Sequence, residues 1–169
     1  MIRFLHDILY SLNSKNLSGD TMKTNPTRYS SAVGEIWVMA TFKVKYYHKV
    51  FDIRAVRELC LVLFYEAFAF YGIRWRKITF DSDHVHMILD MGIYSKIELA
   101  KKLKGFTAKH LFSLIPWLKN NKWEGGYFWG SGFWNPAYDI QSINDMAIYD
   151  RYLDRQKYSS TNQKTLEAY

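Results

Sequence analysis

The chain has 169 residues, of which 49% are hydrophobic and 18% aromatic, which predicts one folded domain and excludes a disordered or fibrous protein. Lys and Arg number 23 against 16 Asp and Glu, and the net charge of +7 favours a polyanionic partner such as nucleic acid, although a basic protein without such a partner has the same composition. The single cysteine excludes an intrachain disulfide, and no apolar run reaches the ~20 residues that span a bilayer, so we expect a cytoplasmic protein without membrane contact.

Residues 1–34 are expected to lie outside the folded domain. The stretch MIRFLHDILYSLNSK spaces its apolar residues as an amphipathic helix does, and residues 13–34 are rich in Ser, Asn, Thr and Gly without periodicity, which is typical of a linker. We predict the domain over 35–157 and a polar tail over 158–169.

Hydrophobic periodicity divides the domain into alternating strands and helices. The predicted elements are, in chain order, a strand at 35–47, a helix at 52–72, strands at 73–80 and 84–91, a helix at 95–116, an edge strand within 123–142 and a helix at 143–158. Asp52 is a plausible N-cap, Gly72 ends the first long helix, and Ser95 with Glu98 forms a capping box for the second. Pro136 favours an edge position for the last strand, because it cannot donate to a strand ladder.

The order β-α-β-β-α-β predicts an α+β, ferredoxin-like (split βαβ) fold: an antiparallel sheet with two helices on one face, here followed by a C-terminal helix. The other face of such a sheet is open to a ligand. The first and third strands are central in this arrangement, which places His84 and His86 in the middle of the sheet. Alternation along the first strand predicts a core face with Ile36, Val38, Ala40, Phe42 and Val44, and an opposite face with Trp37, Met39, Thr41, Lys43 and Lys45.

His84 and His86 lie one residue apart in an apolar strand, so they share a face, roughly 6.6 Å apart along the strand. They form either a metal-binding pair or two ordinary histidines with satisfied nitrogens. Tyr152 and Gln156 are four residues apart, and on a helix they share one face. A glutamine oxygen can bind Mg²⁺ or Mn²⁺ and a tyrosine oxygen can attack a phosphate, whereas the alternative for Tyr152 is a half-buried helix aromatic.

Basic side chains are candidate DNA contacts, with an ordinary solvated surface as the alternative. The candidates are Lys43, Lys45, Lys101, Lys102, Lys104 and Lys109. The aromatic run at 123–138 fits either a dimer core or a base-stacking surface, and the core is favoured because most Trp and Phe side chains are buried.

Several segments together resemble the small single-tyrosine HUH transposases of insertion sequences, the TnpA type that acts on single-stranded DNA. DHVHMIL at 83–89 is similar to the family's Asp-His-Val-His-Leu-Leu signature, and YLDRQ at 152–156 to the Tyr-Ile-Glu-Asn-Gln segment that carries the nucleophile. FKVKYYHKVF at 42–51, KLKGFTAKHLF at 102–112 and YFWGSGFWNPAYD at 127–139 match further family segments in order and spacing. One departure is DIQSIND at 139–145, which lacks the glycine usual in the family.

The resemblance implies that His84, His86 and Gln156 bind a divalent metal, Mg²⁺ or Mn²⁺, and that Tyr152 is the nucleophile. It implies a transposase that nicks and rejoins hairpin-bearing single-stranded DNA through a 5′-phosphotyrosine, and a homodimer whose active sites are shared between subunits. The alternative is a non-catalytic or domesticated hairpin-DNA-binding protein of the same fold. Tyr149 and Tyr158 are nearby competitors for the nucleophile, but neither has a glutamine four residues later.

Overall fold

The computed structural model describes residues 35–130 and 132–158, and a compact unit begins at Ile36. The predicted N-terminal helix, its linker and the tail from 159 onward lie outside the described residues. In the described part the strands are β1 (Trp37–Lys43), β2 (Arg74–Phe80), β3 (His84–Asp90) and β4 (Asp139–Ser142). The α-helices are α2 (Arg54–Tyr71), α3 (Lys96–Leu114), α4 (Trp117–Asn120) and α5 (Met146–Asp154), and two 3₁₀ turns are η1 (Lys45–Tyr47) and η2 (Val50–Asp52).

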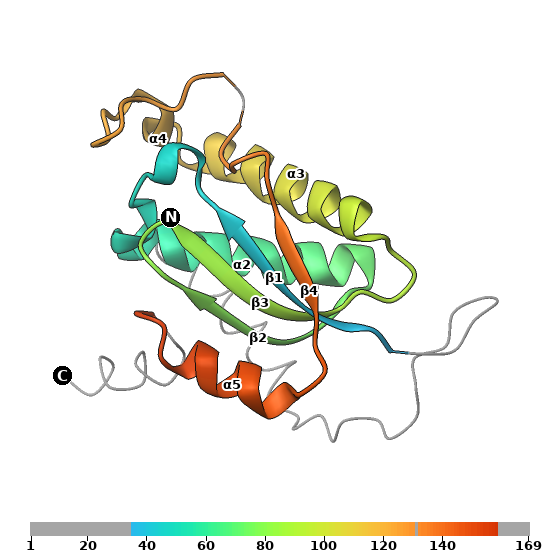
Figure 1. The fold of residues 1–169 in the computed structure, drawn as a ribbon. Helices are drawn as coiled ribbons and strands as arrows, with labels where there is room; N and C mark the ends of the chain where they lie inside the picture. Colours follow the sequence, from blue (N-terminus) through green and yellow to red (C-terminus); the bar gives the residue numbers. More distant parts are fainter. Residues whose placement is uncertain (1–34, 131, 159–169) are drawn as a thin grey trace. The chain divides into compact units, whose positions relative to one another are not determined.

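The four strands form one sheet in the order β2-β3-β1-β4, and every neighbouring pair is antiparallel. Helices α2 and α3 cover one face of the sheet, whereas α5 lies next to strand β2 (Figure 1). The α+β, ferredoxin-like prediction is therefore confirmed, with β1 and β3 central and β4 at an edge after Pro136. No helix in the described ranges is long and apolar enough to cross a membrane.

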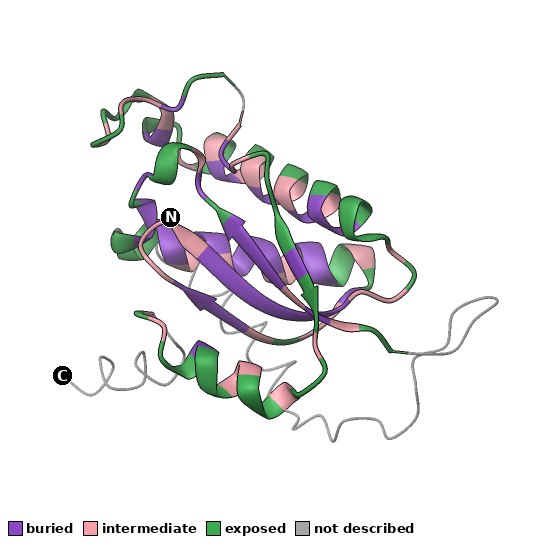
Figure 2. Ribbon diagram, in the orientation of Figure 1, coloured by how far each residue is buried: buried purple, intermediate pink, exposed green. Residues whose placement is uncertain are grey.

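The core lies between the sheet and the pair α2 and α3, because alternate residues of each strand point to that side. Val38, Ala40, Phe42 and Val44 are fully buried, as predicted for the core face of the first strand, whereas Ile36, just before β1, is exposed. Figure 2 shows the buried residues along β1 and β3. Part of the aromatic run joins this core: Phe133 is fully buried, and Trp134 donates from Nε1 to Thr107 Oγ1 of α3 at 2.8 Å. Phe133 and Trp134 are thus buried within the chain itself, whereas Trp129 of the same run is exposed.

The long helices begin and end largely where their sequence signals place them. Ser95 and Glu98 form both hydrogen bonds of the capping box at the start of α3, and Gly72 ends α2 in the left-handed conformation. The prediction that Asp52 caps α2 is wrong, because Asp52 belongs to η2 and Ile53 occupies the N-cap without a side-chain bond.

The predicted helix over 143–158 is too long at both ends. Asp145 caps α5 by accepting from the Ala147 N–H at 3.0 Å, and the helix stops at Asp154. Beyond it, the N–H groups of Arg155 and Gln156 donate to carbonyls three residues earlier, at 3.2 and 3.1 Å. The chain therefore leaves the helix just before Gln156.

Candidate active site

The open face of the sheet carries a row of polar residues that the strand register brings side by side. His86 of β3 lies opposite Thr41 of β1 and Thr79 of β2, and Thr41 lies opposite Asp139 of β4. One step along β3, His84 faces Lys43 of β1. Because paired residues of adjacent strands point to the same face, this row is built from four strands and lies on the side away from α2 and α3.

The two histidine rings lie 4.8 Å apart between centroids and perpendicular to each other. His84 Nδ1 is 2.6 Å from Asp83 Oδ1, and His86 Nδ1 is 2.9 Å from Thr41 Oγ1. With each Nδ1 engaged, the Nε2 atoms are the nitrogens left for a metal ion, and metal-binding histidines in proteins are oriented by such second hydrogen bonds. His86 Nε2 is buried and lacks a hydrogen-bond partner among the described residues, so a ligand there would satisfy it.

Burial, together with a smaller effect of the neighbouring His84, lowers the pKa of His86 from 6.5 to about 4, while Asp81 and Asp139 act in the opposite direction. A neutral ring at physiological pH is the form that binds metals. In the described ranges no group of three or more His, Cys, Asp or Glu side chains is arranged to hold a metal ion. An amide oxygen is a further ligand type that Mg²⁺ or Ca²⁺ accepts.

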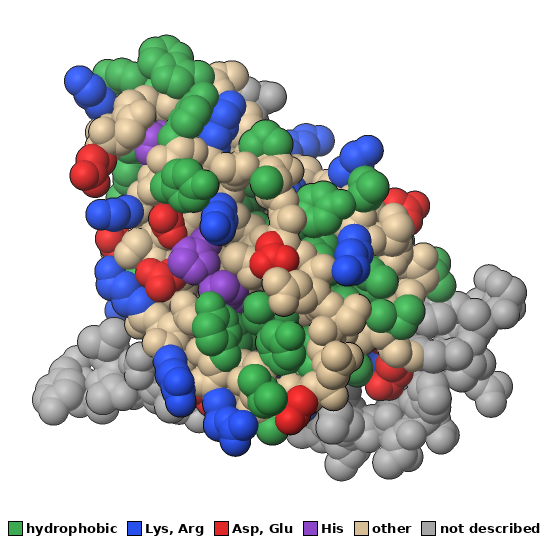
Figure 3. Space-filling view, viewed as in Figure 1, with side chains coloured by type: hydrophobic (Ala, Val, Ile, Leu, Met, Phe, Trp, Pro, Cys, Tyr) green, Lys and Arg blue, Asp and Glu red, His purple; other side chains and the backbone are tan. Residues whose placement is uncertain are grey.

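Tyr152 reaches the same face from α5. Its ring meets the His86 ring edge to face at 5.4 Å between centroids, and the side chain is 45% exposed. Helix α5 is held on the sheet by the buried Leu153 and by ion pairs from β2 to Asp150 at 2.7 Å and Asp154 at 2.5 Å. The structure therefore brings a solvent-accessible tyrosine against His86 of its own chain. Figure 3 shows histidine side chains that reach the surface, with basic, acidic and hydrophobic side chains around them.

Gln156 is half-buried and lies two residues beyond the end of α5. The prediction that it shares a helical face with Tyr152 assumed a helix that continues to 158, and that premise is wrong. Gln156 instead lies in a turn after the helix, where its N–H donates to the Leu153 carbonyl. Its role as the third metal ligand stays a prediction.

The predicted DNA-contacting lysines fall into separate places. Lys43 lies beside His84 on the open face, and Lys45 donates to the Trp129 carbonyl at 2.9 Å. Lys101, Lys102 and Lys109 line a hollow of about 380 Å³ on α3, in the helical layer. The structure does not bring these two groups together.

Lys104 is half-buried and hydrogen-bonded to the protein's own backbone. Its ammonium donates to the carbonyls of Asn135 at 2.9 Å and Ala137 at 2.6 Å, and more weakly to that of Pro136 at 3.4 Å. Burial lowers the pKa of Lys104 to about 8. This lysine fastens the loop that leads into β4, which the sequence pattern of a basic helix flank did not reveal.

The family described as "Transposase IS200 like" matches residues 32–156 of this chain, about three quarters of its length. The chain belongs to the IS200-like transposase family. This confirms the resemblance drawn from the histidine, aromatic and tyrosine segments.

Two individual comparisons agree with the family assignment. The chain is 34% identical over 77 residues to the ISDra2 transposase TnpA of Deinococcus radiodurans, a match that covers 44% of this chain and 51% of that relative, so it spans about half the length of that relative. A crystal structure of a Deinococcus radiodurans R1 protein assigned as a transposase superposes with a TM-score of 0.58 at 22% identity, covering 79% of this chain and 99% of the other, and shows the same fold.

A REP-associated tyrosine transposase bound to a REP hairpin is a more distant structural neighbour. It aligns with a TM-score of 0.48 at 11% identity, over 76% of this IS200-like chain and 68% of the other.

Two polar residues of the site were not predicted from the sequence. Asp83 directly precedes His84, and a carboxylate adjacent in sequence to a candidate ligand already indicates a possible hydrogen-bond partner for that ligand. Thr41 is 45 residues from His86, and only the pairing register of β1 with β3 brings the two together. Its place on the predicted open face of the first strand was the available hint.

Proposed function

We propose that this chain is a metal-dependent transposase that nicks single-stranded DNA at hairpin-bearing element ends and rejoins it through a 5′-phosphotyrosine at Tyr152. The observation that carries the proposal is the meeting of His84, His86 and Tyr152 on one open sheet face. Both histidines are oriented through Nδ1, which is the arrangement expected of metal ligands. Family membership supports the same reaction class.

We propose that a divalent ion binds the two Nε2 atoms with the Gln156 amide oxygen as the third ligand, because imidazole nitrogen and amide oxygen are both donor types for such ions. Mg²⁺ or Mn²⁺ bound there would withdraw negative charge from the scissile phosphate. The Tyr152 oxygen attacks phosphorus and loses its proton, the bond from phosphorus to the 3′ oxygen breaks, and that oxygen gains a proton to leave as a 3′-OH. Rejoining is the reverse attack by a 3′-OH, which releases the tyrosine. One phosphate ester replaces another at each step, so no nucleotide cofactor is needed.

The distribution of lysines supports different DNA-binding roles for the open sheet face and the helical layer. Lys43 beside His84 suits the phosphate of the reacting single strand. The α3 hollow combines Lys101, Lys102 and Lys109 with the aromatic side chains of Phe70 and Phe106, and it suits the phosphate backbone of a hairpin stem. We accordingly propose that the hairpin binds the helical layer while cleavage takes place on the open face.

We also propose a homodimer, a cytoplasmic location and a catalytic domain over 35–157. Because Tyr152 lies against His86 of its own chain, we propose active sites completed within each chain rather than shared between subunits.

The proposal is tested with single-stranded oligonucleotides copied from the flanks of the gene and carrying its imperfect hairpins. Purified protein is incubated with Mn²⁺ or with EDTA, and a denaturing gel is searched for a covalent protein–DNA adduct. We expect an adduct with Mn²⁺, none with EDTA and none in Tyr152→Phe.

Tyr149→Phe is the matched control, because it removes a phenol one turn earlier on α5, and it should form the adduct normally. Tight hairpin binding without any adduct would support the alternative, a hairpin-DNA-binding protein without catalysis. An adduct that persists in Tyr152→Phe would exclude Tyr152 as the nucleophile.

A further inference from the structure

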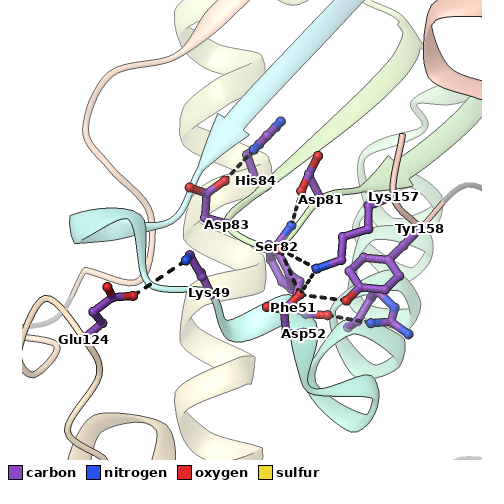
Figure 4. Close-up of polar contacts among 11 residues, drawn as sticks. Lys49, Phe51, Asp52, Asp81, Ser82, Asp83, His84, Glu124, Lys157 and Tyr158 are labelled. Atoms are coloured by element: carbon purple, nitrogen blue, oxygen red, sulfur yellow. Dashed lines mark hydrogen bonds and ion pairs between the residues drawn. The ribbon is translucent and has the colours of Figure 1, made fainter. Parts of the chain in front are cut away.

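The segment that follows α5 returns to the sheet and pairs with it. The Tyr158 N–H donates to the Phe80 carbonyl at 3.0 Å, and the two residues form an antiparallel bridge at the end of β2. Figure 4 shows the Tyr158 side chain next to Asp52 and Lys157. Tyr158 is the first residue of the tail predicted from the sequence. Because Gln156 is only two residues before it, the bridge limits where the Tyr152–Gln156 segment can lie.

Asp52 gathers the side chains around this bridge. Its Oδ1 accepts from the Tyr158 hydroxyl at 2.7 Å, from the Lys157 ammonium at 2.8 Å and from the Ser82 hydroxyl at 2.8 Å. The Arg57 guanidinium lies 3.8 Å from the centre of the Tyr158 ring. We call Asp52, Arg57, Ser82, Lys157 and Tyr158 the Asp52 clamp.

The clamp joins the two halves of the candidate site. Ser82 is in the turn that leads directly into His84, and its carbonyl also accepts from the Phe51 N–H at 3.0 Å. Lys157 directly follows Gln156. One carboxylate therefore fixes both the turn before the histidine strand and the segment after the tyrosine helix, although these are 75 residues apart in sequence.

Helix α5 needs such fixing because its own stability is small. It has nine residues, fewer than the ~12 at which an isolated helix becomes even marginally stable, and Leu153 is its one buried residue. At its start, only residues 143–145 separate α5 from β4, and three residues span at most about 10 Å. The clamp holds the other end.

We propose that Asp52 is a positioning residue that, through Lys157 and Tyr158, fixes the tyrosine helix over the histidines of its own chain. This inference rests on the proposed function, since it assigns Asp52 to the placement of the Tyr152 nucleophile. A nucleophile displaced by about 1 Å loses roughly a hundredfold in rate, so a held helix matters more for cleavage than for DNA binding.

The test compares Asp52→Ala, Tyr158→Phe and the control Glu124→Ala, which removes an exposed ion pair to Lys49 on the same side of the molecule. We expect Asp52→Ala to slow single-turnover adduct formation at saturating DNA and Mn²⁺ by about tenfold or more, with DNA affinity changed less than about twofold. Tyr158→Phe keeps the ring and the backbone bridge, so its rate of adduct formation should lie between those of the wild type and Asp52→Ala. Asp52→Asn retains an acceptor oxygen and should recover much of the rate.

Hydrogen exchange provides a readout that does not depend on catalysis. Asp52→Ala should raise amide exchange in α5 and leave α3 unchanged, whether or not the protein cleaves DNA. A wild type without adduct would reject the proposed function, whereas an adduct formed by Asp52→Ala at the wild-type rate, or unchanged exchange in α5, would reject the clamp.

Mixing two inactive proteins tests whether the helix serves its own chain. Tyr152→Phe supplies intact histidines, and His84→Ala/His86→Ala supplies an intact tyrosine. The clamp predicts no adduct in the mixture, and an adduct would show that α5 reaches the histidines of a second subunit, which contradicts the inference.

Discussion

At the scale of single residues, the site depends on hydrogen bonds that orient groups rather than on the groups alone. A ring bound to metal through Nε2 carries its proton on Nδ1. Thr41 Oγ1 is placed to accept a hydrogen bond from the Nδ1–H of His86. The Asp83 carboxylate does the same for His84. These second contacts determine which nitrogen of each histidine is offered to the open face.

Thr41→Val should lower Mn²⁺ affinity by about 10- to 100-fold, because it removes the acceptor for His86 Nδ1 while keeping the shape of the side chain. Calorimetric titration with Mn²⁺ measures the change. Thr79→Val is the matched control: Thr79 flanks His86 from β2, and its buried hydroxyl has no hydrogen-bond partner in the described part of the chain. Equal losses in the two variants would contradict the role given to Thr41.

Asp52 gives a prediction about pH. Burial alone would raise the pKa of its carboxyl, but hydrogen bonds from Lys157, Tyr158 and Ser82 outweigh burial and lower it from 3.8 to about 2. Folding therefore favours the charged form, so the contribution of the carboxylate to stability is complete above about pH 4 and is lost as the pH falls through about 2.

Urea unfolding of wild type and Asp52→Asn checks this sign. The wild type should be the more stable protein at pH 7, and the difference in free energy of unfolding should shrink steadily below pH 4. Glu124→Gln, which affects an exposed pair with Lys49 at 3.6 Å, should differ little from wild type at any pH. A difference for Asp52→Asn that stays constant down to pH 2.5 would refute the role of its charge.

At the scale of elements, signals confined to one helix or one strand were readable from the sequence. The capping box of α3, the left-handed Gly72 and the inward face of β1 depend on neighbours within four residues, and all are confirmed. The end of α5 and the role of Asp52 were missed because their partners are distant: Asp52 pairs with residues 82, 157 and 158 instead of capping the adjacent helix. A local pattern cannot report such tertiary contacts.

Lys104 gives a test at this scale. Lys104→Met keeps the aliphatic stem but removes the bonds to the 135–137 carbonyls, and should cost about 1–2 kcal/mol of stability without weakening DNA binding. Thermal unfolding and fluorescence anisotropy measure the two effects. Lys101→Met, at an exposed position of the same helix, should weaken DNA binding and leave the stability unchanged. DNA binding that is weakened in Lys104→Met but not in Lys101→Met would contradict the structural role of Lys104.

At the scale of the whole molecule, the sheet separates a candidate chemical face from a basic helical layer. The lysines that contribute to the net charge of +7 lie in different places. Lys43 lies beside the histidines, whereas Lys101, Lys102 and Lys109 lie together on α3. The sequence predicted these lysines as one group, and the fold assigns them to opposite sides.

Replacing Lys101, Lys102 and Lys109 together by Gln should weaken hairpin binding and lower the slope of log affinity against log salt by about 0.9 for each DNA phosphate that is no longer neutralised. Adduct formation at saturating DNA should remain. Lys96→Gln, at the start of α3 and outside the hollow, is the control. An unchanged slope in the triple variant would place the hairpin elsewhere.

Mapping the DNA attachment site by mass spectrometry tests most directly whether Tyr152 is the nucleophile. Trypsin cuts after Arg151 and Arg155, so Tyr152 is released as the peptide YLDR, separate from Tyr149 in 123–151 and Tyr158 in 158–164. After nuclease digestion of the wild-type adduct, we expect a 5′-linked nucleotide on YLDR, and we expect its formation to require the metal. A nucleotide on either of the other two peptides would contradict this expectation.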